Sequence, residues 1–326
     1  MVFRWDFKKM NMKITLISYD YFGYDFQIVA ELQKQGHIAT HIDINKFEFV
    51  YKNVFQRILN FFLKNFLNKN LKQIKLKKYI FEQLNHIGFQ DKILVIRPDL
   101  ISKKTHLLIK KQTNCYICYL YDSAKRFKIS HLTTNVFDDV FSYDFEDAEN
   151  FGFKKISNFM VFDKFEIKSK FQNQVFMIMS PDERLQILNK IVERLDLLQI
   201  KTNCIVVSSE KPLQLNSKII HHTKKISQKE AFEMLYESEI FLDLNRNNHN
   251  GLSFRVFEAM ALQRKVITTN QAILKYDFYN PNNILVLDEN NIKIEAEFFE
   301  TNYVALSNAI FEKYTVENWT KTVFKI

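Results

Sequence analysis

The stretch IFLDLNRNNHNGLSFRVFEAMALQRKVITTN, residues 240–270, predicts a strand, a polar loop, a helix and a second strand. The apolar runs 240–245 and 265–270 are typical of buried strands, and residues 253–263 carry apolar side chains at helical spacing. Two strands joined by a helix form the β-α-β unit of a parallel sheet. The stretch therefore predicts an α/β fold.

The same alternation of strands and helices extends on both sides of this stretch. Short, continuous apolar runs of this kind are typical of parallel strands that are covered on both faces. Toward the C-terminal half, strands are predicted at 174–180, 203–209, 218–223 and 283–288, and helices at 182–198 and 228–238. In the N-terminal half, strands are predicted at 13–18, 38–43, 93–99, 115–122 and 136–143, and a helix at 24–35.

A chain of 326 residues is long enough for two domains of this kind. We expect two Rossmann-like α/β domains, residues 1–168 and 169–326, that face each other across a cleft. The chain is expected to cross between them near residues 160–172. A C-terminal helix around 303–324 is expected to pack back on the first domain.

The loop and helix of the 240–270 stretch carry a predicted anion site. Gly251 permits a close approach of the backbone, and Ser253 is a predicted N-cap of the helix that follows. Backbone N–H groups at a helix start receive anions such as a diphosphate, and Arg255 adds a forked donor. Glu258 lies one turn further, where its carboxylate could accept hydrogen bonds from ribose hydroxyls. The alternative interpretation is a capping serine and a half-exposed helical glutamate.

Residues 250–270 resemble the C-terminal signature of the group 1 glycosyltransferases, which have the two-domain GT-B fold. In that family an E-x7-E element binds the sugar nucleotide, and its second glutamate matches Glu258. The first glutamate is replaced here by Asn250. SYDFEDAENFG (142–152) and YLYDS (119–123) resemble, more weakly, segments of capsule and lipopolysaccharide sugar transferases.

The resemblance implies a hexosyltransferase-like enzyme that moves a sugar from a nucleotide-sugar donor to a saccharide or lipid-linked acceptor, in surface polysaccharide or lipopolysaccharide biosynthesis. It places the donor on the C-terminal domain and the acceptor on the N-terminal one, with no cofactor and no metal. Arg184, at a predicted helix start, is a second candidate for diphosphate contact. Asp122 and Asp20, each just past a predicted strand, are candidates for the catalytic base; the alternative is that they form or cap turns, as aspartates often do there.

The net charge of +9 is concentrated in one segment. Residues 51–81 contain eight Lys and Arg and no Asp or Glu, with apolar residues at helical spacing. Such a basic amphipathic helix is typical of a membrane-surface element. An ordinary packed helix with a solvated lysine face is an equal alternative, and no motif supports nucleic acid as a partner. We expect a cytoplasmic protein, peripheral at the inner face of the cell membrane if this segment binds lipid, because no apolar run is long enough to cross a membrane.

Two other classes of function compete with this interpretation. An NAD-dependent oxidoreductase would fit the opening β-α-β unit, but the loop SYDYFGYDF (18–26) lacks the G-x-G-x-x-G of a dinucleotide site. A non-enzymatic basic protein that binds membranes or nucleic acid would leave the 240–270 stretch unexplained. Redox or zinc chemistry at Cys115 and Cys118 is disfavoured because both lie in an apolar strand, as does Cys204.

Overall fold

The computed structural model describes residues 11–67, 70–127, 129, 132, 134–161, 170–247 and 249–326. The chain divides into two compact units. The first contains the described residues up to Ser142, together with Glu146–Ile156 and Thr320–Ile326. The second contains Tyr143–Phe145 and Ser157–Trp319. The boundary expected at residues 168 and 169 lies outside the described residues and stays a prediction.

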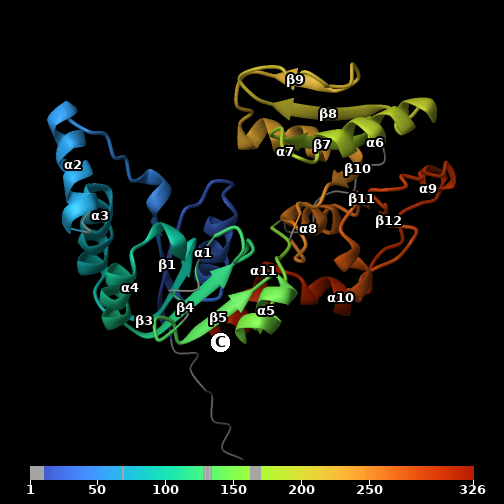
Figure 1. Ribbon diagram of the computed structural model, residues 1–326. Helices are drawn as coiled ribbons and strands as arrows, with labels where there is room; N and C mark the ends of the chain where they lie inside the picture. The colour runs from blue at the N-terminus through green and yellow to red at the C-terminus, as the bar shows by residue number, and fades with distance from the viewer. Residues whose placement is uncertain are drawn as a thin grey trace, which may run out of the picture. The chain divides into compact units, whose positions relative to one another are not determined.

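The first unit is built on a parallel six-stranded sheet in the order β2-β1-β3-β4-β5-β6 (Figure 1). Its strands are β1 (Lys13–Ser18), β2 (Ile38–Asp43), β3 (Gln90–Ile96), β4 (Thr113–Leu120), β5 (Asp139–Ser142) and β6 (Lys154–Lys155). Its helices are α1 (Tyr24–Lys34), α2 (Val54–Leu67), α3 (Leu71–Ile87) and α4 (Lys103–Ile109), with α5 (Phe145–Phe151) starting in the other unit.

Alternating residues of these strands pack against helices on opposite faces of the sheet. On one face, α3 buries Leu76, Ile80 and Leu84 against strand residues that include Val95 and Cys118. Figure 1 shows α3 and α4 on this side of the sheet and α1 on the other. Strands covered on both faces need continuous apolar runs, which is why β1, β3 and β4 were recognisable from the sequence.

The second unit has its own parallel six-stranded sheet, in the order β12-β11-β10-β7-β8-β9. Its strands are β7 (Asn173–Met179), β8 (Thr202–Val207), β9 (Ile220–His222), β10 (Ser238–Asp243), β11 (Lys265–Thr268) and β12 (Ile284–Val286). Its helices are α6 (Leu185–Leu197), α7 (Gln228–Tyr236), α8 (Phe254–Ala261), α9 (Glu297–Glu300) and α10 (Asn308–Lys313), and α11 (Val316–Phe324) ends in the first unit. The predicted α/β class with two Rossmann-like sheets is confirmed.

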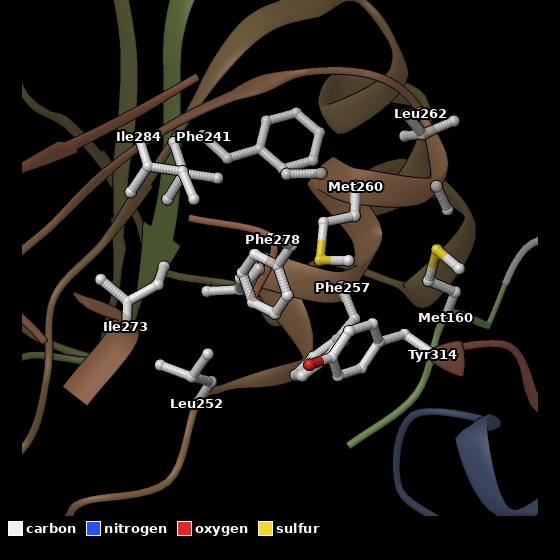
Figure 2. Packing of buried hydrophobic residues seen from close by; sticks show 14 of the residues in the cluster. Met160, Phe241, Leu252, Phe257, Met260, Leu262, Ile273, Phe278, Ile284 and Tyr314 are labelled. Atoms are coloured by element: carbon white, nitrogen blue, oxygen red, sulfur yellow. The ribbon is translucent and has the colours of Figure 1, made fainter. Parts of the chain in front are cut away.

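The core of the second unit forms around α8. Figure 2 shows Phe257 and Met260 of this helix among Phe241 of β10, Phe278 and Tyr314. Phe257 is fully buried and meets the rings of Phe278 and Tyr314 at centroid distances of 6.2 and 5.8 Å. This packing holds the helix start, and the loop before it, against the ends of the strands.

Two sequence predictions were wrong in detail. The single C-terminal helix expected around 303–324 is two helices, α10 and α11, because the chain turns at Tyr314 and Thr315. The residues from Thr320 onward belong to the first unit, where Thr320 accepts a hydrogen bond from Gln35 at 2.8 Å. The basic region 51–81 lies in α2 and the first part of α3 rather than in one helix.

Candidate functional site

The carboxyl edge of the second sheet carries a polar cavity. Strands β10, β11 and β12 run parallel and end there at Asp243, Thr268 and Val286. Ligands of such sheets bind beyond the carboxyl ends of the strands. The cavity has a volume of about 570 Å³. It is lined by Asn245, Arg246, Asn247, His249, Asn250, Thr269, Asn270, Gln271, Ala272, Leu287, Asp288, Glu289 and Asn290.

Arg255 reaches the same edge from the first turn of α8. Its two terminal nitrogens donate to the carbonyls of Leu242 and Ile178, each at 3.3 Å, at the ends of the neighbouring strands β10 and β7. Its Nε is buried and has no hydrogen-bond partner within the described residues. The guanidinium of Arg255 is thus held at the sheet edge by two backbone carbonyls. Among the described residues, no carboxylate is hydrogen-bonded to it.

Arg184 and Arg246 share the carboxylate of Asp182. Arg184 forms a forked pair with it, at 2.9 and 2.6 Å, and also donates to the carbonyl of Leu244 at 3.0 Å. Arg246 approaches the same carboxylate at 3.5 Å. Partial burial opposes ionisation of Asp182, but hydrogen bonds from Arg184 outweigh it and lower its pKa. Asp182 thus holds both guanidinium groups at the carboxyl edge of the sheet.

Ser253 occupies the N-cap position of α8 but does not cap the helix with its side chain. Its hydroxyl donates instead to Oδ1 of Asp243 at 2.7 Å, and Thr268 donates to Oδ2 of the same carboxylate at 3.0 Å. The predicted N-cap position is therefore confirmed, but the hydroxyl bonds to the buried Asp243, which needs these donors, and makes no cap hydrogen bond. Because the hydroxyl of Ser253 is bonded to Asp243, it accepts no hydrogen bond from the N–H groups in the first turn of α8.

Gly251 is required by packing against an aromatic ring. A Cβ at this position would lie 2.3 Å from the ring of Tyr143, so any side chain would clash. Tyr143 also meets His249 through its hydroxyl at 3.1 Å, and the N–H of Asn250 donates to Asp144 at 2.9 Å. Residues 143 and 144 therefore fix the loop that lines the cavity. The sequence predicted close backbone approach at Gly251 but gave no sign that Tyr143 would be the group that approaches.

Glu258 is 7% exposed and lies on α8 among the buried residues Phe257, Ala259 and Met260. Among the described residues, neither Glu258 nor Arg255 lines the 570 Å³ cavity, whereas Asn250 does. Burying a carboxylate costs free energy unless the carboxylate is hydrogen-bonded. A glutamate at position 258 is therefore expected to have a specific structural or functional role. Its predicted contact with a ribose stays a prediction.

The carboxyl edge of the first sheet is rich in carboxylates. Asp20, after β1, accepts from the N–H of Phe26 at 3.0 Å, and its own N–H donates to Asp43 at 3.3 Å. Asp25, in the first turn of α1, is buried. Burial, helped by the negative charges of Asp20 and Asp43 and opposed by a hydrogen bond from Ser18, raises the pKa of Asp25 to about 7. Nothing in the sequence marks Asp25, because an acid in a first helical turn is common.

Asp122, after β4, is held by its own neighbours. It accepts from Nη1 of Arg126 at 2.5 Å and from the N–H of Ser123 at 3.0 Å. Nearby, Arg97 has a left-handed backbone with φ of 61° and pairs with Asp99 through two hydrogen bonds of 2.9 Å. The cavity at this edge measures only about 10 Å³.

Metal and redox chemistry gain no support from the described residues. These contain no group of three or more His, Cys, Asp or Glu that could hold a metal ion. Cys115, Cys118 and Cys204 are free, and burial raises the pKa of the Cys204 thiol to about 12. A thiol with so high a pKa is a poor nucleophile and metal ligand at neutral pH.

Comparison with family models and with curated proteins finds no match. Solved structures do match. The catalytic domain of starch synthase IV from Arabidopsis thaliana, bound to ADP and acarbose, has a TM-score of 0.51 and 10% identity over 97% of this chain and 95% of that one. UDP-GlcNAc 2-epimerase from Neisseria meningitidis, bound to UDP-GlcNAc, has a TM-score of 0.49 and 13% identity, over 96% and 98%. WaaG, a glycosyltransferase involved in lipopolysaccharide biosynthesis, has a TM-score of 0.47 and 11% identity, over 95% and 94%.

Identities this low concern the fold alone. The expected GT-B type of fold, with two α/β units each built on a parallel six-stranded sheet, is confirmed by the topology and by the match to starch synthase IV. Within the described residues, no helix is long and apolar enough to span a membrane.

Proposed function

We propose that the protein is a glycosyltransferase whose nucleotide-sugar donor binds at the carboxyl edge of the second sheet. The observation that carries this proposal is the combination of three guanidinium groups, Arg184, Arg246 and Arg255, with a polar cavity of about 570 Å³. Forked guanidinium donors suit phosphate oxygens, and the amide-rich lining suits a sugar and a base, which need donors and acceptors together.

In this proposal the arginines hold the diphosphate and stabilise the negative charge that grows on it as the sugar leaves. Such preorganised positive charge does the work that a metal ion does in other transferases, so the enzyme needs no metal and no cofactor. Glu258 accepts from the ribose, and Asn250 faces the donor from the cavity wall. The match to a starch synthase domain bound to ADP and acarbose supports a nucleotide and a saccharide as substrates for this fold.

The acceptor is a saccharide or a lipid-linked glycan of surface polysaccharide or lipopolysaccharide biosynthesis. Its hydroxyl oxygen forms a bond to the anomeric carbon, the bond from that carbon to the diphosphate oxygen breaks, and the hydroxyl proton passes to a carboxylate. Asp122 or Asp20 is that base. The strands before them, β4 and β1, both flank β3, so the two residues stand about 10 Å apart and only one of them can reach a given hydroxyl.

The test is a calorimetric titration of the protein with UDP-, ADP-, GDP-, dTDP- and CMP-sugars and with NAD. One sugar nucleotide is expected to bind, and an R184M/R255M variant should lose roughly tenfold to a hundredfold in affinity for each lost charge-assisted contact. The matched control is K201M, since Lys201 is an exposed cation just before β8, at the amino ends of the strands of the same sheet. Binding of NAD alone, or equal affinity in both variants, would refute the proposal.

A product assay separates transfer from other uses of the same donor. Incubation with a bound sugar nucleotide and a mixture of saccharide and lipid-linked acceptors should release the nucleoside diphosphate and form a glycoside. Conversion of the donor sugar with no glycoside formed would show a different enzyme at the same site.

A further inference from the structure

Helix α2 is amphipathic, but its apolar side faces solvent. Val54, Phe55, Phe61 and Phe66 have exposed fractions of 70%, 80%, 62% and 75%. Ile58, Leu59 and Phe62 are also about half exposed, and the rings of Phe62 and Phe66 stack at a centroid distance of 5.8 Å. We call these seven side chains the α2 apolar face. Contiguous exposed apolar surface of this kind marks an interaction site.

A buried asparagine lies on the side of α2 that faces the protein. Asn60 is 3% exposed, and its side chain donates to the hydroxyl of Tyr51 at 2.6 Å and accepts from the N–H of Leu71 at 2.8 Å. Asn60 therefore ties α2 to the start of α3. In Figure 1, α2 lies beside α3, away from the sheet of the first unit. With Asn60 bonded on this side, the α2 apolar face lies on the other side of the helix. The two hydrogen bonds of Asn60 thus help to fix the orientation of α2.

The segment that contains α2 and the start of α3 is positively charged. Residues 51–81 contain no acid, and Lys72, Lys77 and Lys78 of α3 are exposed. The first carboxylate, Glu82, forms an exposed pair with Lys78 at 3.6 Å. An exposed apolar helix face within a basic segment suits an anionic lipid leaflet, whose acyl chains take up apolar side chains and whose headgroups attract lysine and arginine.

We propose that the α2 apolar face inserts into the surface of an anionic membrane and makes the protein peripheral to it. A second copy of this chain is a poorer occupant, because it would bring the same basic segment and like charges repel. A protein partner would have to supply both an apolar groove and an acidic rim. The membrane supplies both without any further assumption, and the proposal does not depend on the proposed enzymatic activity.

The test is flotation of the full chain with vesicles of phosphatidylcholine alone and of phosphatidylcholine mixed with phosphatidylglycerol. We expect binding to the mixed vesicles, weakened by added salt. F55S/F62S/F66S should bind them at least about tenfold less, since three aromatic side chains leave the interface. K72E/K77E/K78E should lose the preference for anionic lipid. F26S/F89S, which removes two other exposed phenylalanines of the same unit, should bind as the wild type does.

A second measurement does not depend on multiple substitutions. Trp fluorescence of a single F55W variant, after subtraction of the wild-type signal, should be quenched by brominated lipid, while that of F89W should not. Absence of vesicle binding by the wild type, equal binding by F55S/F62S/F66S, or equal quenching at both positions would overturn the proposal. A change from dimer to monomer in F55S/F62S/F66S without vesicle binding would assign the face to a second copy and also overturn it.

Discussion

The carboxyl edges of the two sheets have the same backbone plan but differ in their charged residues and in the size of the cavity. At the first, carboxylates dominate, Asp122 is paired with Arg126, and the cavity measures about 10 Å³. At the second, Arg184 and Arg246 share Asp182, Asp288 and Glu289 line the cavity with Arg246, and the cavity measures about 570 Å³. The cavity at the second edge is therefore large enough for an anion of substrate size, and the cavity beside Asp122 is not. Parallel strands supply the position of a site, and the side chains after each strand decide what it binds.

The largest effect is expected if one carboxylate of the first edge is the catalytic base. Asp122→Asn should then lower kcat by roughly a hundredfold to ten-thousandfold, because the acceptor proton has no base to receive it. Donor affinity should stay near the wild-type value, since the donor is proposed to bind at the other edge. Asp20→Asn is the matched variant, and steady-state kinetics of both decide between them. Near-normal kcat in both variants would remove the base from this edge.

The next effect concerns stability at the first edge. The folded chain keeps the proton of Asp25 up to a pH of about 7, whereas an unfolded aspartate releases it near 4. Its contribution to stability is therefore complete below pH of about 4 and lost as the pH rises through about 7. Asp25→Asn, which cannot ionise, should raise the free energy of unfolding at pH 8 by up to about 4 kcal/mol.

Urea unfolding of wild type and Asp25→Asn at several pH values measures this difference. The gap should shrink as the pH falls from 8 toward 5. A gap that stays constant with pH would show that Asp25 ionises normally in the folded chain.

At the second edge, Glu258→Gln tests the ribose contact. Loss of a charge-assisted hydrogen bond should weaken the donor by about 1.5–3 kcal/mol, measured by calorimetric titration. Because Glu258 is buried, thermal unfolding of the variant without ligand is the necessary control. Unchanged donor affinity in a folded variant would leave Glu258 with a structural role only.

Gly251→Ala tests the packing that shapes the second edge. The new Cβ would lie 2.3 Å from the ring of Tyr143, and overpacking of this kind typically costs about 1–3 kcal/mol. The melting temperature of the variant should fall, and the Y143A/G251A double variant should recover part of the loss because the ring is gone. Additive losses in the double variant would contradict the clash.

The smallest effect is expected from chelation. If guanidinium groups neutralise the leaving diphosphate, transfer rates with EDTA and with added Mg²⁺ should agree within error. A strong loss of rate in EDTA would mean that the charge at the second edge is incomplete without a metal ion.

Local patterns of the sequence predicted the strands of both sheets well. β1, β4 and β10 are buried on both faces, so each is a continuous apolar run between polar loops. β6 has only the two exposed residues Lys154 and Lys155, so no hydrophobic signal marked it. Two residues at this edge could also be named from the sequence. Asn250 lies in the polar loop after a predicted strand, and Arg255 lies in the first turn of the predicted helix that follows. Arg246 was missed, since an arginine in a polar loop looks like a solvated one.

The sequence by itself determined the α/β class, the order of most elements and the amphipathic character of α2 and α8, because these depend on residues that are near in the chain. Only the tertiary structure decided which way each amphipathic helix faces. α8 buries Phe257 in the core, while α2 is held by Asn60 and turns Phe55 and Phe66 to solvent. The same is true of Gly251, whose need for a bare Cα comes from Tyr143, a residue more than a hundred positions away. Contacts between distant segments leave no periodic trace in the sequence, so they could be seen only in the folded chain.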